Sequence, residues 1–550
     1  MSPRAHPFLR VADLNVRYPG RPSPALTGLS LGLDRGERIL LLGPSGAGKT
    51  TFLLSLAGIV PQVIYAEATG TIVVDGVDAC LTPPALLARS VGLLFQDPDA
   101  QLCMPTVEEE VAFGLENLGV PPDAMEPRIR SALDAVGLTS RRALRIDRLS
   151  GGLKQRLALA DILAMAAPVL LLDEPTAHLD PRGTREFFDV LERVTPSGFV
   201  LVEHKLEHVV PLVTHVVALS PEGRVLVEGT PLTVFGQHAS LLDAIGIWLP
   251  PATRVARAAG MDGNILTLDH LRAAIGTSTD TAHRILHSLP SPRSPAAPGG
   301  AAISVSGLSY TYSRGPQALH DVTLRVSEGD FLALVGSNGS GKTTLALHLV
   351  GILRPPPASV TILGRDIAAT PSWEIPSLIG YVFQNPEHQF VTDTVLGEVR
   401  YTLRRRGLGE SDATAEAHRV LTRYGLAPVA DLHPYQLSQG AKRRLSVLTV
   451  LVAAPRVLVL DEPTFGQDAR TNHALLADMV RLNEQGLTIL MITHDMDAVG
   501  QFARSVAVMH EGRITHHGAV ANLPRTGDRL EEAGLELPFT MRVRTLTGAA

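Results

Sequence analysis

One eight-residue segment constrains the fold of this chain more than any other. Residues 43–50 read GPSGAGKT and fit the phosphate-loop pattern GxxxxGK[ST]. The apolar run before it, 38–42, predicts a buried parallel strand, and residues 51–57 predict the first turns of a helix. A second match, GSNGSGKT at 336–343, follows another apolar run at 331–335. A glycine-rich turn with a surface lysine is the ordinary alternative, but two matches in the same strand-to-helix context favour phosphate binding.

Each residue type in the two loops suits an anion. Glycines let backbone N–H groups close around a phosphate, the lysine reaches the terminal phosphates, and the threonine after it suits Mg2+. The candidate ligand-binding residues are therefore Gly43, Pro44, Ser45, Gly46, Ala47, Gly48, Lys49, Thr50 and Thr51, with Gly336, Ser337, Asn338, Gly339, Ser340, Gly341, Lys342, Thr343 and Thr344 in the second copy. Thr50 and Thr343 are also the first candidate metal ligands.

Length and composition limit the class of protein. A chain of 550 residues exceeds the roughly 250 to 300 residues of a single core, so two large halves are expected. The net charge is −6 without long blocks of like charge, which argues against a nucleic-acid partner. Two cysteines, Cys80 and Cys103, suit reduced packing residues and the cytosol. No window of about 18 uninterrupted apolar residues and no export signal is present, so any membrane role is expected to be peripheral.

The region before the first phosphate loop predicts β-structure. Residues 9–35 alternate apolar runs with turns and predict an antiparallel strand pair, and 69–77 predict a hairpin. Tyr18 falls in the turn of the pair, where an aromatic residue is usually a packing residue. Tyr312 takes the same place before the second loop, which favours stacking of both rings on a base.

Polar residues follow the next two strands. The strand at 90–95 ends on Gln96, and Gln384 follows a second copy at 379–383. Carboxyl ends of strands are where open α/β sheets bind ligands, so contact with Mg2+ or a reacting water is favoured over simple capping.

A second pair of strands ends in acids. Residues 169–172 lead into Asp173, which suits Mg2+, and Glu174, which suits polarising a water. The strand at 198–202 leads to His204, whose imidazole could hydrogen-bond a phosphate, although a lone histidine is more often a surface residue. The second copies are Asp461, Glu462 and His494.

A helical insert precedes the first acidic strand. Residues 106–145 show three- and four-residue apolar spacing, and LSGGLKQR at 149–156 predicts a helix capped by Ser150, Gly151 and Gly152. The second copy is Ser438, Gln439 and Gly440. Each cap adds an anion-binding helix terminus to a half that already has one, with pure capping as the alternative.

The two halves are a tandem duplication. Lys342, Gln384, Ser438, Asp461 and His494 follow Lys49, Gln96, Ser150, Asp173 and His204 at separations of 293, 288, 288, 288 and 290 residues. The tails that end at Val255 and Val543 are again 288 apart. Residues 286–302 are rich in Pro, Ala, Ser and Gly and predict a linker. The expected division is a first domain at 1–235, an extension and linker at 236–302, a second domain at 303–520 and an extension at 521–550.

Phosphate loop, glutamine, LSGG cap, LLLDEP and histidine in this order resemble the ABC ATPases over nearly the whole chain. The resemblance implies an α/β fold with two P-loop domains, each with a mainly parallel core sheet, an antiparallel β subdomain and a helical subdomain. It implies ATP and Mg2+ as cofactors, and intramolecular pairing in which the ATP on one phosphate loop meets the cap of the other domain. Lys49, Thr50, Gln96, Asp173, Glu174 and His204 would then pair with Ser438 and Gly440, while Lys342, Thr343, Gln384, Asp461, Glu462 and His494 would pair with Ser150 and Gly152. Leu153, in place of the usual glutamine, and Gln439, in a glycine position, depart from the pattern.

Smaller details are similar to a narrower group, the duplicated ATPases of energy-coupling factor transporters. These are QDPDAQL at 96–102, LSQGAKRRLSV at 437–447 and DEPTFGQD at 461–468. The similarity implies uptake of a vitamin or transition-metal ion through a membrane scaffold and a substrate-binding membrane subunit, with this chain at the cytoplasmic face of the membrane. The ATPase of another importer or of an exporter stays an alternative. A soluble tandem protein acting on ribosomes or DNA is disfavoured by the Pro- and Ala-rich linker and the charge of −6.

Overall fold

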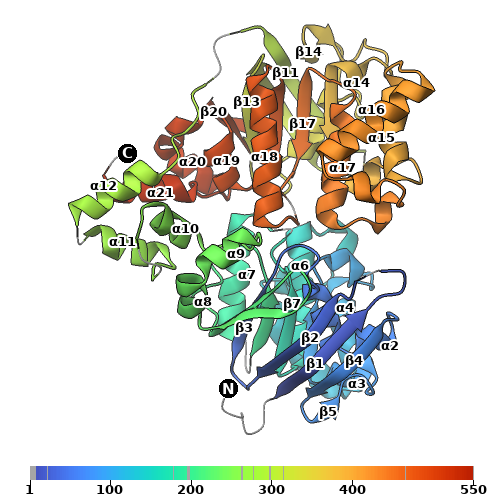
Figure 1. Cartoon of the computed structure of the whole chain (residues 1–550), viewed down its shortest axis with the longest axis vertical. Helices are drawn as coiled ribbons and strands as arrows, with labels where there is room; N and C mark the ends of the chain where they lie inside the picture. Colours follow the sequence, from blue (N-terminus) through green and yellow to red (C-terminus); the bar gives the residue numbers. More distant parts are fainter. Residues whose placement is uncertain are drawn as a thin grey trace. The chain divides into compact units, whose positions relative to one another are not determined.

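The computed structural model describes residues 8–21, 23–177, 179–194, 198–261, 264–276, 278–295, 299–313, 315–464 and 466–548. They form two compact units, one made of residues 1–288 with 468–470 and the other of residues 289–467 with 471–550 (Figure 1). Residues 296–298 of the expected linker lie outside the described residues. Among the described helices, none is both long enough and apolar enough to cross a membrane.

The first unit begins with a four-stranded antiparallel sheet of order β2-β1-β4-β5. Its strands are β1 (Leu9–Arg17), β2 (Leu26–Leu33), β4 (Glu67–Val74) and β5 (Val77–Asp78). The register pairs Leu9 with Leu33 and Val16 with Leu26, which confirms the predicted strand pair, and β4 with β5 forms the predicted hairpin.

A six-stranded core sheet of order β10-β9-β3-β8-β7-β6 carries the phosphate loop. Its strands are β3 (Arg38–Leu42), β6 (Val91–Leu94), β7 (Val169–Asp173), β8 (Phe199–Val202), β9 (His215–Leu219) and β10 (Val225–Gly229). All neighbours are parallel except β10, which pairs antiparallel with β9. The expected mainly parallel sheet is confirmed.

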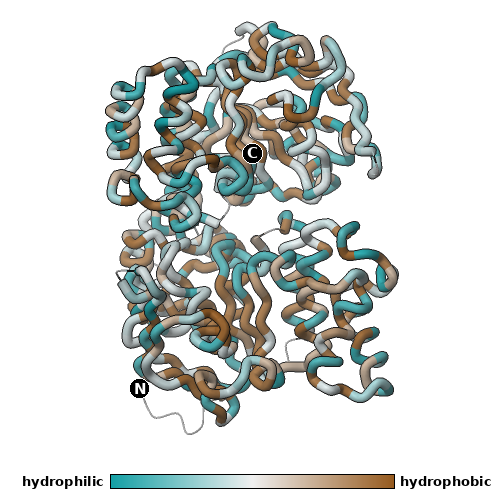
Figure 2. Tube along the Cα trace, turned by 90° about the vertical axis from the view of Figure 1, so that its right-hand side faces the viewer, coloured by the Kyte–Doolittle hydropathy of each residue, from teal (hydrophilic) through white to brown (hydrophobic). Residues whose placement is uncertain are grey.

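Helices cover both faces of this sheet, which is why its strands are continuously apolar. Ile39 and Leu41 of β3 pack in one cluster with α1 (Lys49–Leu56) and the antiparallel sheet. Leu40 and Leu42 point the other way, into a cluster with α6 (Gly151–Met165) and α7 (Pro181–Val194). Figure 2 shows the apolar strands of this core running inside a more polar surface.

The predicted helical insert is present as α4 (Val107–Asn117) and α5 (Pro122–Ala135), which pack against α6. Thr106 and Glu109 form a reciprocal capping box at the start of α4. The remaining helices of the first unit are α2 (Ile59–Gln62), α3 (Pro84–Leu87), α8 (Pro231–Gln237), α9 (Ala239–Ala244), α10 (Pro251–Ala258), α11 (Leu268–Gly276) and α12 (Thr279–Ser288), with 3-10 turns η1 (Pro98–Ala100), η2 (Thr139–Arg141) and η3 (Ile146–Arg148).

The second unit repeats this plan strand for strand. Its antiparallel sheet has the order β12-β11-β14-β15 and its core sheet the order β16-β17-β18-β13-β19-β20. The strands are β11 (Ala301–Thr311), β12 (Gln317–Ser327), β13 (Phe331–Val335), β14 (Val360–Ile362), β15 (Arg365–Asp366), β16 (Ile379–Val382), β17 (Val457–Asp461), β18 (Thr488–Thr493), β19 (Ser505–His510) and β20 (Arg513–Ala519).

Most helices of the second unit repeat helices of the first. They are α13 (Lys342–Leu349), α14 (Ile375–Leu378), α15 (Val395–Arg405), α16 (Glu410–Arg423), α17 (Gln439–Leu451), α18 (Ala469–Glu484), α19 (Met496–Phe502), α20 (Gly527–Glu532) and α21 (Phe539–Leu546), with 3-10 turns η4 (Pro386–Gln389), η5 (Ala427–Val429), η6 (Pro434–Gln436) and η7 (Val520–Thr526). The tail helices α20 and α21 begin 288 residues after α9 and α10, so the repeated tail sequence forms the same pair of helices.

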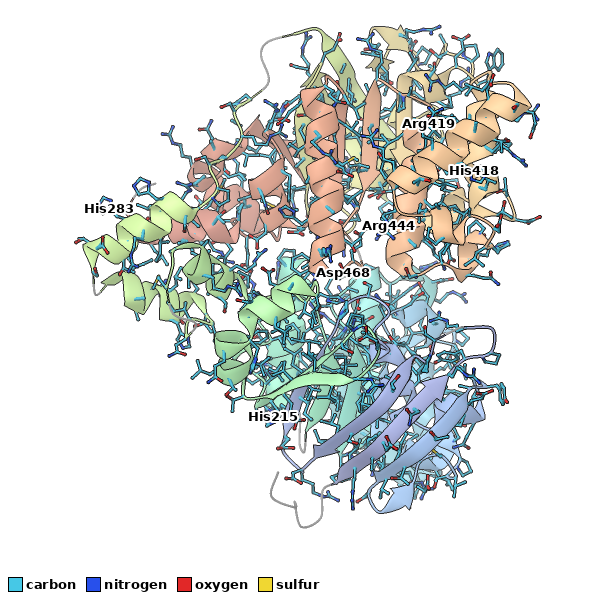
Figure 3. All side chains as sticks on the ribbon, in the orientation of Figure 1. His215, His283, His418, Arg419, Arg444 and Asp468 are labelled. Carbon is cyan, nitrogen blue, oxygen red and sulfur yellow. The ribbon has the colours of Figure 1, made fainter. Side chains whose placement is uncertain are left out.

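Helix α16 shows how a subdomain helix is fixed by its sequence. Ala413, Ala417 and Leu421 recur every four residues and are buried in the helical subdomain. His418 and Arg419 lie on the exposed side of the same helix (Figure 3). This division between a small apolar face and a charged face is what a surface helix requires.

Candidate functional site

The first phosphate loop lies between β3 and α1, as predicted. Gly48 has φ 85° and precedes the helix, and a Cβ there would lie 2.3 Å from the carbonyl oxygen of Ala25. Only glycine fits this position without moving the backbone. Lys49 begins the helix, and its ammonium donates to the carbonyl oxygens of Gly43 at 2.9 Å and Pro44 at 3.1 Å.

The second loop has the same geometry between β13 and α13. Gly341 has φ 103°, and Lys342 donates to the carbonyl oxygens of Gly336 at 2.9 Å and Ser337 at 2.8 Å. In both units the lysine ammonium lies over the loop that would hold the phosphates. Phosphate binding by the loops stays a prediction, and the geometry fits it.

Buried charges surround the first lysine. Burial lowers the pKa of Lys49, and the nearby carboxylates of Glu174 and Asp173 partly offset that effect. A buried ammonium beside two carboxylates favours a ligand that brings both negative charge and a metal ion. The negative charge of the ligand then balances the lysine, and the metal ion balances the two carboxylates.

The predicted metal ligands meet at the same sheet edge. In the second unit the hydroxyl of Thr343 donates to Oδ2 of Asp461 at 3.2 Å. In the first unit burial raises the pKa of Asp173 to about 6, while a hydrogen bond from Thr50 acts in the opposite direction. The hydroxyl at the start of the helix and the carboxylate at the end of the neighbouring strand are the hard oxygen ligands that Mg2+ prefers, so the donor set fits this ion.

Two predicted residues of the first unit contact the carboxylate of a third, Glu174. Oε2 of Glu174 accepts from Nε2 of Gln96 at 2.9 Å, and Oε1 lies 3.0 Å from Nε2 of His204. Glu174 has φ 43°, an unusual conformation for a residue with a side chain. The sequence placed these residues at the ends of three strands, and the sheet order brings them together.

The second unit holds its equivalent carboxylate differently. Glu462, with φ 46°, contacts Nδ1 of His494 at 2.8 Å and accepts from the hydroxyl of Thr493 at 3.2 Å. In the first unit the position of Thr493 is taken by the buried Glu203, which accepts from the hydroxyl of Thr176 at 2.6 Å.

The two tyrosines expected to stack on a base are anchored alike. The hydroxyl of Tyr18 lies 3.2 Å from Oγ1 of Thr51, and that of Tyr312 lies 3.1 Å from Oγ1 of Thr344. Each ring is thus fixed to the first turn of the helix that follows its phosphate loop. The arrangement leaves base stacking as a prediction for both.

The LSGG-type caps begin α6 and α17, as predicted, but their serines differ. Ser438 accepts a capping bond from the N–H of Ala441 at 3.4 Å, whereas the Ser150 side chain makes no capping bond. Gln439 is the first helical residue of α17, and its φ is not positive. A Cβ at the equivalent Gly151 would meet nothing within 4 Å, so the position has open space for a side chain. Gly152 and Gly440 follow within the same helices.

Several contacts were missed by reading the sequence. Tyr381 on β16 donates its hydroxyl to Oδ2 of Asp461 at 2.7 Å. The acids that follow the two glutamines form ion pairs with the LSGG-type helices, Asp99 with Lys154 and Glu387 with Lys442, each at 2.5 Å. The repeated lysine four residues after each serine was the signal that could have indicated this pairing.

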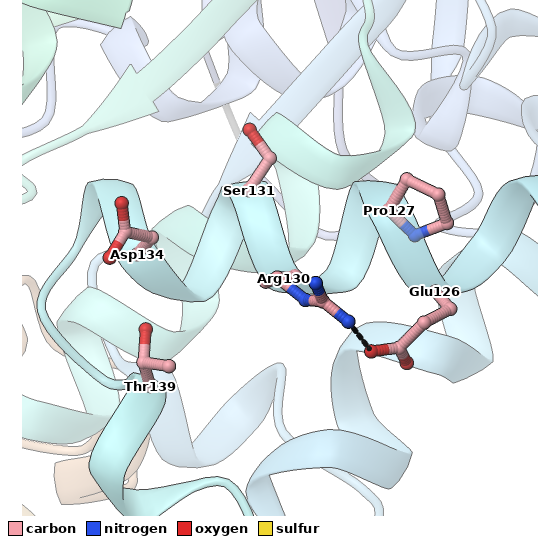
Figure 4. A pocket seen from close by; sticks show the side chains of 6 residues that line it. All are labelled: Glu126, Pro127, Arg130, Ser131, Asp134 and Thr139. Atoms are coloured by element: carbon pink, nitrogen blue, oxygen red, sulfur yellow. Dashed lines mark hydrogen bonds and ion pairs between the residues drawn. The ribbon is translucent and has the colours of Figure 1, made fainter.

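Two surface pockets lie outside the phosphate loops. One is formed on α5 in the helical subdomain by Glu126, Pro127, Arg130, Ser131, Asp134 and Thr139, with an ion pair between Glu126 and Arg130 along its edge (Figure 4). None of the predicted ligand-binding residues lines it. The other is lined by apolar residues from α3, β6 and α6 together with Gln101 and Asp161.

Comparison with known proteins defines the class. A family model described as "ABC transporter" matches residues 26–177 and 319–465. The chain therefore belongs to the ABC transporter family, as an ATP-binding protein with two fused ATPase domains that energises transport. The expected family, fold class and ATPase activity are confirmed.

Particular relatives span nearly the full chain. YkoD of Bacillus subtilis (strain 168), named as a candidate HMP/thiamine import ATP-binding protein, is 36% identical over 546 residues, covering 97% of this chain and 95% of its own. An ABC transporter ATP-binding protein of Methanosarcina acetivorans is 34% identical over 552 residues, covering 98% of this chain and 90% of its own. Among solved structures, cbiO1 from Clostridium perfringens, described as part of the ABC transporter complex cbiONQ, is 31% identical and covers 42% of this chain and 99% of its own, with a TM-score of 0.37.

Proposed function

We propose that this protein is the ATPase subunit of an energy-coupling factor importer and hydrolyses MgATP to drive uptake of a vitamin or transition-metal ion. The observation that carries the proposal is the full-length similarity to YkoD, a relative named for import of HMP/thiamine. The repeated acid and lysine pairs after Gln96 and Gln384 support the narrower group, because they occur at the segments that resemble it.

In this proposal each unit binds one ATP on its own phosphate loop. Lys49 and Lys342 turn from their loop carbonyls to the triphosphate. Thr50 with Asp173, and Thr343 with Asp461, hold Mg2+, with Gln96 and Gln384 as further ligands. The ion, when bound, neutralises charge that develops on the phosphates.

The same proposal assigns the hydrolytic step to the paired acid and histidine of each unit. Glu174 and Glu462 polarise the attacking water, and His204 and His494 orient the carboxylate and contact the terminal phosphate. The distances of 3.0 Å and 2.8 Å between histidine nitrogen and carboxylate oxygen support this division of roles. The caps at 150–152 and 438–440 would each complete the site of the other domain, as the family resemblance implies.

Docking to the membrane partners is assigned to η1 and η4. Asp99 in η1 is 65% exposed at its side chain, and Gln101, which follows η1, lines the second pocket. An exposed carboxylate beside the nucleotide site suits a basic segment of a membrane scaffold. The protein would then work at the cytoplasmic face of the membrane, with no nucleic-acid partner.

The proposal is tested by co-expressing the protein with the scaffold and binder encoded beside its gene and measuring uptake in vesicles. We expect ATP-dependent uptake of either a thiamine-class compound or a divalent transition metal, lost in the double variant Glu174→Gln, Glu462→Gln. Co-purification with ribosomes, or efflux instead of uptake, would contradict the proposal in favour of the other classes.

A further inference from the structure

The two units differ at one buried position behind the catalytic carboxylates. Helix α17 carries Arg443 where α6 carries Gln155, 288 residues earlier. Arg443 is 2% exposed. Its guanidinium donates from Nη1 to the carbonyl oxygen of Phe383 at 2.6 Å and from Nη2 to that of Gln384 at 2.5 Å. Nη2 also lies 3.4 Å from the carbonyl oxygen of Glu462.

These three carbonyls belong to the two segments that carry Gln384 and Glu462, whose relative position determines the geometry of the ATP site. Phe383 and Gln384 follow β16, and Glu462 follows β17, its parallel neighbour. A planar guanidinium can bond several acceptors at once in a fixed geometry, and a charged donor makes stronger bonds than a neutral one. Arg443 therefore joins the backbone at Gln384 to the backbone at Glu462 without using either side chain.

The first unit holds the same junction by a weaker contact. Nε2 of Gln155 lies 3.5 Å from the carbonyl oxygen of Phe95, and its Oε1 is buried with no hydrogen-bond partner among the described residues. There Gln96 reaches the catalytic carboxylate through its own side chain, at 2.9 Å. When that amide turns toward a metal ion or a water, the link between Gln96 and Glu174 is broken.

A second difference strengthens the contrast. Tyr381 donates to the metal-binding Asp461 at 2.7 Å, and Leu93 occupies the equivalent place in the first unit. The sheet edge of the second unit thus has two polar links, from Arg443 and Tyr381, where the first unit has an amide and an aliphatic side chain.

We propose that Arg443 is a positioning residue that clamps the Gln384 segment to the backbone of Glu462, so that the two units hold the same catalytic groups with different rigidity. The clamp makes the segment after Gln384 move together with β17. The equivalent segment after Gln96 moves independently of β7. This inference rests on the proposed function only in taking Gln384 and Glu462 as residues of the ATP site.

Hydrogen exchange of the full-length protein without nucleotide tests the clamp directly. Arg443→Gln copies the residue that the first unit already accommodates, so the fold should tolerate it. We expect peptides covering 384–389 to exchange on the order of tenfold faster than in the wild type, because a charge-assisted bond is lost, with peptides covering 96–101 unchanged. Arg456→Gln, which removes an arginine of a mostly exposed ion pair with Glu328, is the matched control and should change neither segment.

Two further variants separate positioning from a general need for positive charge. Arg443→Lys keeps the charge but cannot reach all three carbonyls, so we expect it to exchange nearly as fast as Arg443→Gln. The reciprocal Gln155→Arg should slow exchange at 96–101. In a Lys49→Ala background only the phosphate loop of the second unit keeps its lysine. There, Arg443→Gln should raise several-fold the Mg2+ concentration needed for half-maximal binding of a fluorescent ATP analogue.

The outcomes are distinct. Unchanged exchange at 384–389 in Arg443→Gln, or full rescue by lysine, overturns the clamp whatever the ATPase activity. Failure of the wild type to bind MgATP, with the exchange pattern as expected, overturns the proposed function and leaves the clamp standing.

Discussion

Replacing each catalytic carboxylate in turn tests whether both ATP sites hydrolyse. We expect Glu174→Gln and Glu462→Gln each to reduce steady-state turnover on the order of 100-fold to 10,000-fold, the usual contribution of a positioned general base. That range corresponds to about 3 to 5.5 kcal/mol of lost transition-state stabilisation. Each single change should suffice under the proposed pairing of the two domains, in which reopening requires hydrolysis at both sites.

The caps bear on the size of the expected effect. A glutamine forced to positive φ would cost roughly 1 kcal/mol or more and would slow the site that uses it. Gln439 instead starts α17 in helical conformation, at a position equivalent to the uncrowded Gly151. The structure therefore removes that reason for a weaker first site, and the two variants should be similarly impaired.

Phosphate release under steady-state conditions is the assay, with Gln439→Gly as the control. We expect the control to keep wild-type turnover, since its helix already begins without strain. Near-normal turnover in Glu174→Gln combined with loss in Glu462→Gln would refute the reasoning, because the first site would then be regulatory.

Three further predictions concern binding, docking and stability. Lys49→Ala and Lys342→Ala should each weaken one of two sites for a non-hydrolysed ATP analogue in a calorimetric titration. Each variant loses a charge-assisted contact of about 1.5 to 3 kcal/mol, which lowers affinity roughly 10- to 100-fold. Two unaltered sites in the double variant would contradict this prediction. Asp99→Lys together with Glu387→Lys should uncouple uptake from ATP hydrolysis while basal ATPase activity continues. The charge swap Asp99→Lys, Lys154→Asp restores the internal ion pair and should uncouple uptake equally. Full uptake in the swap variant would show that the ion pair matters and the docking charge does not. Asp161→Asn should stabilise the first unit by about 1 to 3 kcal/mol in thermal unfolding at pH 8 and by little at pH 4. Burial raises the pKa of Asp161, so the carboxylate destabilises the fold only as pH rises above the pKa of about 4 that it has in the unfolded chain. The same gain in stability at both pH values would contradict this cause.

The fold could be predicted from the sequence where one local signal decided the structure. Continuous apolar runs such as 38–42 indicated buried strands, and the glycine at position 48 indicated the turn into α1, because both patterns can be recognised within a few residues of sequence. The duplication then supplied the predicted site residues twice.

The candidate site was predictable in its members but not in its contacts. Tyr381 and Asp461 are 80 residues apart and meet only because β16 lies beside β17. Strand order across a parallel sheet is set by crossover connections and not by apolar spacing, so the sequence could not show which strand ends are neighbours. The ion pair of Asp99 with Lys154 was hidden for the same reason, since it joins η1 to a helix 55 residues later.

Three differences between the units lie behind the catalytic groups. Lysine, both acids and histidine occur in each unit. Leu93 of the first unit corresponds to Tyr381 of the second, Gln155 to Arg443 and Glu203 to Thr493. None of these three pairs changes which group polarises water, and each changes what holds that group. The rigidity of an ATP site alters how readily its residues move together with the docking segment. The hydrolytic step depends on the lysine, acids and histidine themselves. The two sites should therefore differ in how tightly hydrolysis is tied to movement of η1 or η4, and should share the capacity to hydrolyse ATP.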